Sequence, residues 1–251
     1  MSHNHYEDYH GHGNGDGHHG HNHHDHSHIP QIPTLPSQSL YTKIDLSRVS
    51  GLNLLNRNDS LSGLFKNSET KYQIRPVFQT DLDNQLILNI PFTDNIKLYS
   101  IILRTNGNLD HCPKNIKFFK NNDSIDFNNV NDIHSNHHCE HPLVGYFENV
   151  EYELSNDLVN GRTQLEIRED STFVEHHLPR HVFNNVNFLT IYFQNNWSND
   201  DEEYLQLYSI EFRGEWSPLS KSHIITNYES AANPADHKNL LKQENKNYSE
   251  L

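Results

Sequence analysis

One stretch near the end of the chain, residues 204–216 with the sequence YLQLYSIEFRGEW, constrains the fold more than any other. In its second half Tyr208, Ile210 and Phe212 alternate with polar residues, and a period of two is typical of a half-buried strand. The two leucines that precede them fall on the opposite phase of this alternation. We therefore expect the strand either to begin with both faces covered or to contain a bulge near Tyr208.

The end of this stretch carries two predictions about individual side chains. We expect Gly214 to end the regular run, and we expect the strand to stop before Pro218, because proline has no N–H to donate to a ladder. Trp216 is interpreted as an aromatic side chain that packs at the end of the domain, since large aromatics usually serve packing. Trp and Arg also dominate interface hot spots, so a docking role for Arg213 stays open.

Other short apolar segments separated by turn residues predict further strands. A Thr-Asp-Asn turn at residues 93–95 suggests a hairpin between two of them, and the folded part is expected to open at residues 39–46. No segment shows a long run of apolar residues at helical spacing, which favours an all-β sandwich over βαβ units. The predicted strands are Gln85–Phe92, Ile96–Arg104, Ile116–Lys120, Thr163–Ile167 and Asn187–Phe193.

Charge and cysteine content exclude several classes of protein. The 33 acidic and 19 basic side chains give a net charge of −14, which repels nucleic-acid backbones and anionic membranes and favours a monomer. No run is apolar over the length that a membrane span requires, and no apolar segment follows Met1 as in a secretory signal. Two cysteines form no disulfide framework. We therefore expect a protein of the cytoplasm and nucleus.

Both ends of the chain differ in composition from the middle. Residues 1–28 hold 11 of the 21 histidines, and a Pro-rich connector follows, so we expect a disordered tail over 1–36. The folded domain is expected at 37–237 and a flexible tail at 238–251. Clustered imidazoles bind zinc, copper or nickel, so a metal-binding protein is the first alternative function.

Several of these segments together resemble a known family, the PITH domain. Glu211–Trp216 and Asn227–His237 resemble the end of that domain, Ile90–Leu98 resembles its central hairpin, and Leu40–Leu46 resembles its opening strand. The His-rich start is similar to stand-alone PITH proteins without a thioredoxin module. No Cys-x-x-Cys occurs here, so redox activity is not implied. The sequence departs from the family between Phe127 and Tyr146, where an Asn- and His-rich stretch predicts a longer loop.

The resemblance implies a jelly-roll β-sandwich of the galactose-binding-like type that docks onto the 26S proteasome regulatory particle without being an enzyme. Loops on a rigid sandwich are where recognition residues concentrate. The candidate partner-binding residues are Arg213, Glu215, Trp216, Tyr228, Asn233, Asp236 and His237.

Two further sites are weighed as alternatives. A tetrahedral zinc site could be formed by two cysteines and two histidines, namely Cys112, His137, His138 and Cys139. Their spacing along the chain, however, is not the paired-knuckle spacing of familiar structural zinc sites. A polar surface loop with one thiol packed as a small hydrophobe is the preferred interpretation, so no cofactor is expected. A carbohydrate-binding sandwich is the second alternative function, and Trp197 is its one candidate residue.

Overall fold

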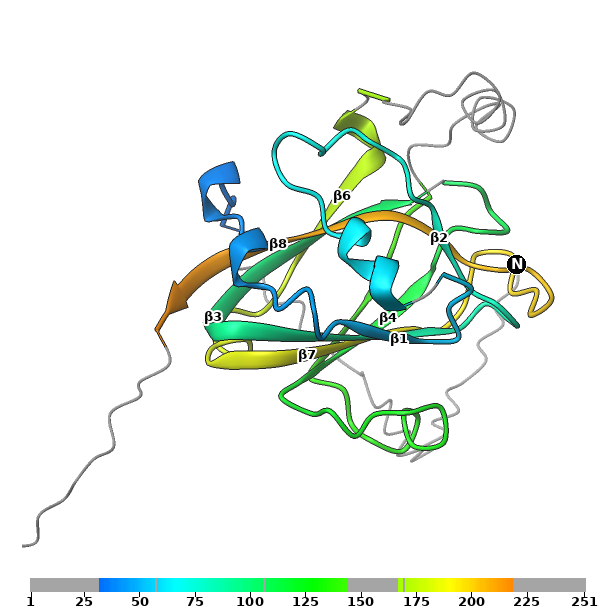
Figure 1. Ribbon diagram of the computed structural model, residues 1–251. Coiled ribbons are helices and arrows are strands. Elements are labelled where there is room, and N and C mark those ends of the chain that lie inside the picture. Colours follow the sequence, from blue (N-terminus) through cyan, green and yellow to red (C-terminus); the bar gives the residue numbers. More distant parts are fainter. Residues whose placement is uncertain (1–31, 57, 106, 144–166, 169, 219–251) are drawn as a thin grey trace, which may run out of the picture. The chain divides into compact units, whose positions relative to one another are not determined.

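The computed structural model describes residues 32–56, 58–105, 107–143, 167–168 and 170–218 (Figure 1). The larger compact unit of the chain begins at Thr34. Three predictions lie mostly or wholly outside the described residues, namely the His-rich tail, the strand at 163–167 and the tail at 238–251.

The described residues form eight strands and four short 3-10 turns, and every pairing between these strands is antiparallel. The all-β jelly-roll prediction is therefore confirmed. The turns are η1 (Pro36–Gln38), η2 (Tyr41–Lys43), η3 (Asn58–Leu64) and η4 (Asp170–Thr172). The strands are β1 (Ser50–Leu52), β2 (Phe78–Gln79), β3 (Leu86–Thr105), β4 (Asn115–Lys120), β5 (His137–Glu140), β6 (Phe173–His177), β7 (Val186–Phe193) and β8 (Gln206–Ser217).

Strand β3 is the longest of these described elements, with 20 residues, and it belongs to both layers of the sandwich (Figure 1). Its first half pairs with β1 and β7, and its second half pairs with β6 and β8. The hairpin predicted at residues 93–95 is therefore wrong. These polar residues lie where the register against β7 shifts, between Pro91 and Ile96, and the chain continues onto β8 without reversing.

Strand β8 contains the bulge near Tyr208 that was one of the two alternatives predicted from the leucine phase. Arg104 of β3 pairs with Ser209 and Thr105 pairs with Leu207, so Tyr208 is the extra residue. Leu207 and Ile210 both enter the main core, whereas Tyr208 joins a separate small cluster. The alternation of Tyr208, Ile210 and Phe212 that the sequence suggested therefore does not put all three in one core, because the bulge changes the phase between Tyr208 and Ile210.

The end of β8 meets one expectation and fails another. The strand stops at Ser217, before Pro218, as predicted. It runs through Gly214 without ending, because the lack of a side chain lets the two backbones approach. A Cβ atom at Gly214 would lie 2.2 Å from the carbonyl oxygen of Lys97. Glycine is therefore required here for close packing of β8 on β3, and it does not end the strand.

The predicted opening strand is also wrong. Residues 39–46 form the turn η2 with two isolated bridges, between Ser39 and Arg213 and between Ile44 and Phe92. The apolar residues of this segment still enter the main core, since Leu40 and Ile44 are buried there. Their burial requires only that the segment crosses the open edge of the sandwich, which a turn satisfies as well as a strand.

Candidate functional site

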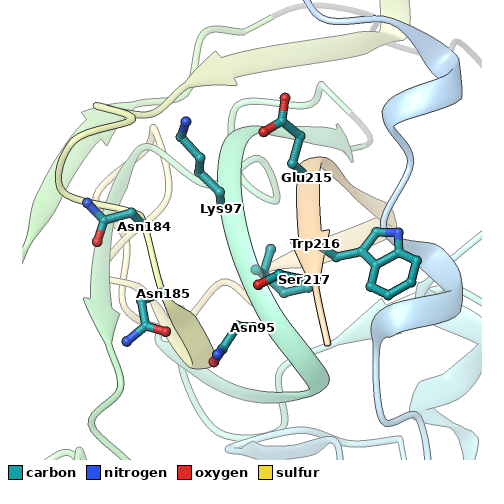
Figure 2. Close-up of a pocket in the computed structure, with 8 residues that line it drawn as sticks. Asn95, Lys97, Asn184, Asn185, Glu215, Trp216 and Ser217 are labelled. Carbon is teal, nitrogen blue, oxygen red and sulfur yellow. The ribbon is translucent and has the colours of Figure 1, made fainter. Parts of the chain in front are cut away.

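The last three residues of β8 form the exposed end of the strand that the sequence singled out. Glu215, Trp216 and Ser217 are all exposed, and they pair with the segment Asn95–Lys97 of β3. Successive strand residues point to opposite faces, so Glu215 and Trp216 lie on different sides of the sheet. Figure 2 shows this separation, with the indole directed away from Lys97 and Glu215.

Trp216 is not the packed side chain that the sequence predicted. It is 51% exposed, and the Nζ of Lys43 lies 3.2 Å from the centroid of its ring. The same ammonium is 3.0 Å from the carboxylate of Asp94. The prediction assumed that Gly214 turned the chain back onto the core. Because the strand continues instead, it carries the indole beyond the apolar interior, where a cation covers it.

On the other face of β8, a shallow hollow of about 250 Å³ lies between this strand, β3 and the turn before β7 (Figure 2). Asn184 and Asn185 contribute polar side chains from that turn. The lining residues are Asn95, Ile96, Lys97, Asn184, Asn185, Glu215, Trp216 and Ser217.

A buried tyrosine links the charged residues beside this hollow. The Arg180 guanidinium lies 3.8 Å and the Lys97 ammonium 5.6 Å from the centroid of the Tyr99 ring. Burial raises the pKa of Tyr99 to about 12, and the hydrogen bond to Glu215 and its charge add to this rise against the opposing Arg180. The phenol therefore stays protonated and donates to the carboxylate of Glu215, which holds that side chain beside Tyr99.

We define the Trp216 surface as the five side chains Lys43, Asp94, Lys97, Glu215 and Trp216. Two of them were candidate partner-binding residues. The other three come from η2 and from the middle of β3, and no local sequence pattern marks them as belonging together. Their assembly depends on the long pairing of β3 with β8.

Arg213 has a different environment from its neighbours in β8. Its guanidinium donates to Glu211 at 2.8 Å and to the Thr34 hydroxyl at 3.2 Å. Its side chain is only 12% exposed. This residue therefore fastens the start of the folded unit onto β8, and little of it remains for a partner to contact.

The hydroxyl of Thr34 continues this network into the second layer. It donates to Glu175, which also accepts from the Ser100 hydroxyl at 2.5 Å. Burial by itself raises the pKa of Glu175. The hydrogen bonds from Ser100 and Thr34, with the charges of His177 and Arg213, outweigh that effect and lower the pKa. The carboxylate is thus stabilised in its charged form.

The four remaining candidate partner-binding residues, Tyr228, Asn233, Asp236 and His237, lie outside the described residues.

The four candidate zinc ligands occupy separate environments. His137 and Cys139 point toward the interior from β5, whereas His138 is exposed on its opposite face. The Cys112 thiol lies 3.4 Å from the hydroxyl of Thr105. Burial raises the pKa of Cys112 to about 11 and that of Cys139 to about 12, so without a metal ion both thiols are protonated near neutral pH. In the described part of the chain, no three His, Cys, Asp or Glu side chains form a metal-binding group.

Trp197, the candidate for sugar stacking, is half-buried in a loop. Its indole N–H donates to the carbonyl of His141 at 2.8 Å, and Lys114 lies 4.7 Å from the ring centroid. The ring thus stabilises the end of β5, and one face is already covered by a cation.

A buried row of hydrogen-bonded polar side chains, which the sequence did not indicate, lies beside β5. The Nδ1 of His141 is 2.8 Å from the Nε2 of His176, and the other ring nitrogen of His141 is 3.3 Å from the Thr105 hydroxyl. His141 follows β5 and His176 lies in β6, so their hydrogen bond connects the edges of the two layers. The two residues are 35 positions apart in sequence, and only the fold brings them together.

Among the described residues, no helix combines the length and apolar character needed to cross a bilayer.

Comparison with solved structures finds carbohydrate-binding folds at low similarity. A CBM32-3 module of a family 31 glycoside hydrolase from Clostridium perfringens aligns with a TM-score of 0.38 and 11% identity, over 71% of this chain and 96% of that one. The lectin domain of lectinolysin, complexed with Lewis B antigen, aligns with a TM-score of 0.36 and 6% identity, over 67% of this chain and 92% of that one.

Comparison of sequences identifies the family. The PITH domain matches residues 30–232. The chain is 34% identical to the PITH domain-containing protein GA19395 of Drosophila pseudoobscura pseudoobscura, over 81% of this chain and 82% of the relative. It is 30% identical to the human PITH domain-containing protein 1, over 79% of this chain and 80% of the relative. The chain therefore belongs to the PITH domain family.

Proposed function

We propose that this protein is a non-enzymatic interaction module that docks through its Trp216 surface onto the proteasome regulatory particle or a related large complex. The observation that carries this proposal is the half-exposed indole of Trp216 at the end of a rigid strand. Because the transfer free energy scales with the apolar area removed from water, about half of that of the indole is still to be gained from a partner. Trp is also the residue type most enriched in interface hot spots.

The charges around the indole support a protein partner. Lys43 and Asp94 form an ion pair on one side of β8, and Lys97 and Glu215 lie on the other side. Alternating signs of this kind select a partner of complementary pattern and set its orientation.

The identity of the partner rests on the family resemblance. A domain of the cytoplasm and nucleus would meet the regulatory particle there, and a monomer would leave its Trp216 surface free for it. The net charge of −14 supports the monomer, because identical chains repel each other at low salt.

Binding of the purified full chain to immobilised, intact regulatory particle tests the proposal. The wild-type chain is expected to bind at low micromolar concentration, and Trp216→Ala is expected to weaken binding at least about tenfold. Leu109→Ala is a matched control, because Leu109 is 49% exposed and lies outside the Trp216 surface. Thermal melts check that both variants fold.

Two results would remove the main support for this proposal. One is a wild-type chain that the particle fails to retain at low micromolar concentration. The other is a folded Trp216→Ala variant that binds as tightly as the wild type.

A further inference from the structure

A second exposed feature lies away from the Trp216 surface, between β1 and the turn that connects β2 to β3. It is a groove of about 610 Å³. We call it the apolar groove, and it shares no lining residue with the hollow beside β8. Its lining residues are Gly51, Leu52, Asn53, Leu54, Leu55, Asn56, Asp81, Leu82, Asp83 and Phe127.

Exposed apolar side chains gather in this groove. Of the nine large hydrophobic side chains that are exposed in the described part of the chain, four line it: Leu52, Leu55, Leu82 and Phe127. Leu82 is 83% exposed and Leu55 is 56% exposed. Scattered exposed leucines are ordinary, but a cluster of this kind around one depression indicates a binding surface.

The backbone that presents these side chains is fixed before any partner arrives. Asn53 adopts a left-handed conformation, with φ of 64°, and accepts a hydrogen bond from the amide of Leu82 at 3.0 Å. Its side-chain amide donates to the carboxylate of Asp83 and to the carbonyl of Gln85, each at 2.6 Å.

The loop that carries Leu55 is fixed in the same way. The backbone amide of Leu55 donates to the carbonyl of Gln79 at 3.0 Å. The Asn56 side chain donates to the Val77 carbonyl at 3.1 Å and accepts from the Gln79 amide at 3.0 Å. Preorganised loops lower the entropic cost of binding, so the apolar groove has the properties of a docking site.

The charge of the apolar groove indicates what binds there. Asp81 and Asp83 are its only charged lining residues, and both are acidic. Next to them, Asn84 donates to the backbone of Asp200 at 2.9 Å and to the carboxylate of Asp201 at 3.3 Å, which adds carboxylates close by. An acidic rim around an apolar floor attracts cations and disfavours acidic segments.

We propose that the apolar groove binds a segment of another protein in which apolar side chains are flanked by Lys or Arg. The apolar side chains of that segment pack on Leu82, Leu55 and Phe127, and its basic residues lie against the aspartates. This site is independent of the Trp216 surface and allows the domain to hold two partners, or two parts of one complex.

Selection from a displayed library of random nine-residue peptides against the full chain tests the proposal. Enriched peptides are expected to place Lys or Arg within a few residues of a pair of apolar side chains. Leu82→Ser and Asp81→Lys are each expected to weaken their binding about tenfold or more, and 0.5 M salt is expected to weaken it as well. Both side chains are exposed, so neither variant should unfold. Leu109→Ser, at an exposed leucine outside the apolar groove, should bind as the wild type.

Four outcomes would overturn the proposal. The first is a selection that enriches no peptides or enriches acidic ones, and the second is unchanged binding by folded Leu82→Ser. In the third, deletion of residues 238–251 tightens peptide binding, which would assign the apolar groove to the chain's own Lys238–Lys242. In the fourth, sedimentation shows a dimer that Leu82→Ser abolishes, which would assign it to a second copy.

Discussion

The hydrogen-bonded histidine pair between the two layers predicts how the stability of the domain depends on pH. His141 is fully buried and His176 is 8% exposed. Burial lowers the pKa of His141 to about 3, with a contribution from His176, and lowers that of His176 to about 4, with contributions from His137 and His177. Both rings are therefore neutral in the folded protein at any pH above about 5.

The sign of the effect follows from proton binding by the two states. Above the unfolded pKa of about 6.5, neither state binds protons at these rings and the stability is complete. Below this pKa the unfolded chain binds protons at both rings but the folded chain does not. The free energy of unfolding therefore falls until the pH reaches the pKa values of the folded state. For each ring, the free energy of unfolding falls by about 1.4 kcal/mol per pH unit below about 6.5. At pH 5 the loss amounts to about 2 kcal/mol per ring and about 4 kcal/mol for the pair.

Guanidinium unfolding between pH 8 and pH 5 measures this loss. The double variant His141→Asn, His176→Gln keeps hydrogen-bonding groups near the two bonded nitrogens but cannot titrate. We expect its free energy of unfolding to fall by about 4 kcal/mol less than that of the wild type over this range. The other histidines are common to both proteins and cancel in the comparison. Trp197 fluorescence reports locally, since its indole N–H donates to the His141 carbonyl.

Equal pH dependence in the wild type and the double variant would refute the reasoning. If the double variant fails to fold, His176→Gln alone should remove about half of the difference, about 2 kcal/mol at pH 5. Circular dichroism gives an independent midpoint at each pH and shows whether the transition remains two-state.

Three further predictions concern stability and reactivity. Gly214→Ala should lower the free energy of unfolding by about 3 kcal/mol, measured by guanidinium titration, because the new Cβ would lie 2.2 Å from a backbone oxygen. Gly51→Ala should lower it less, because the nearest contact of its Cβ would be 3.3 Å, to a side-chain atom. Arg104→Lys should cost about 3 kcal/mol in the same assay, since the buried guanidinium donates to one hydroxyl and two carbonyls that an ammonium cannot reach together. Cys112 and Cys139 have thiol pKa values of about 11 and 12, so little thiolate forms at pH 8 in the folded chain. Both should therefore react with a disulfide reagent at least about a hundredfold more slowly in the folded than in the unfolded chain. Rapid labelling of the folded protein would contradict this.

Local patterns in the sequence predicted the strands that have a regular alternation or a continuous apolar run. Residues 187–193 were apolar on both faces and form β7, which lies between β3 and β4. The phase of the leucines before Tyr208 limited the start of β8 to two alternatives, one of which was the bulge that the structure contains. These features depend on residues within one strand, so periodicity contains the information needed to predict them.

Features that depend on partners far along the chain were missed. The turn residues at 93–95 are equally compatible with a hairpin and with an exposed irregularity in a continuous strand, and only the pairing with β8 distinguishes them. Arg104 is fully buried because its guanidinium meets acceptors on Tyr72, Ile167 and Thr172, which lie 32 to 68 positions away. Nothing near Arg104 in the sequence indicates that these acceptors exist.

Strand β3 explains why these features are arranged as they are. Its middle, Asn95–Lys97, pairs with the end of β8 and thereby positions the Trp216 surface. Its first half pairs with β1, which forms one wall of the apolar groove, and its last residue, Thr105, contacts His141 of the histidine pair. Each feature therefore uses a different partner of one continuous strand. Surface changes such as Trp216→Ala or Leu82→Ser should act on one feature alone, whereas Gly214→Ala, which separates β8 from β3, should weaken docking at the Trp216 surface together with the stability of the fold.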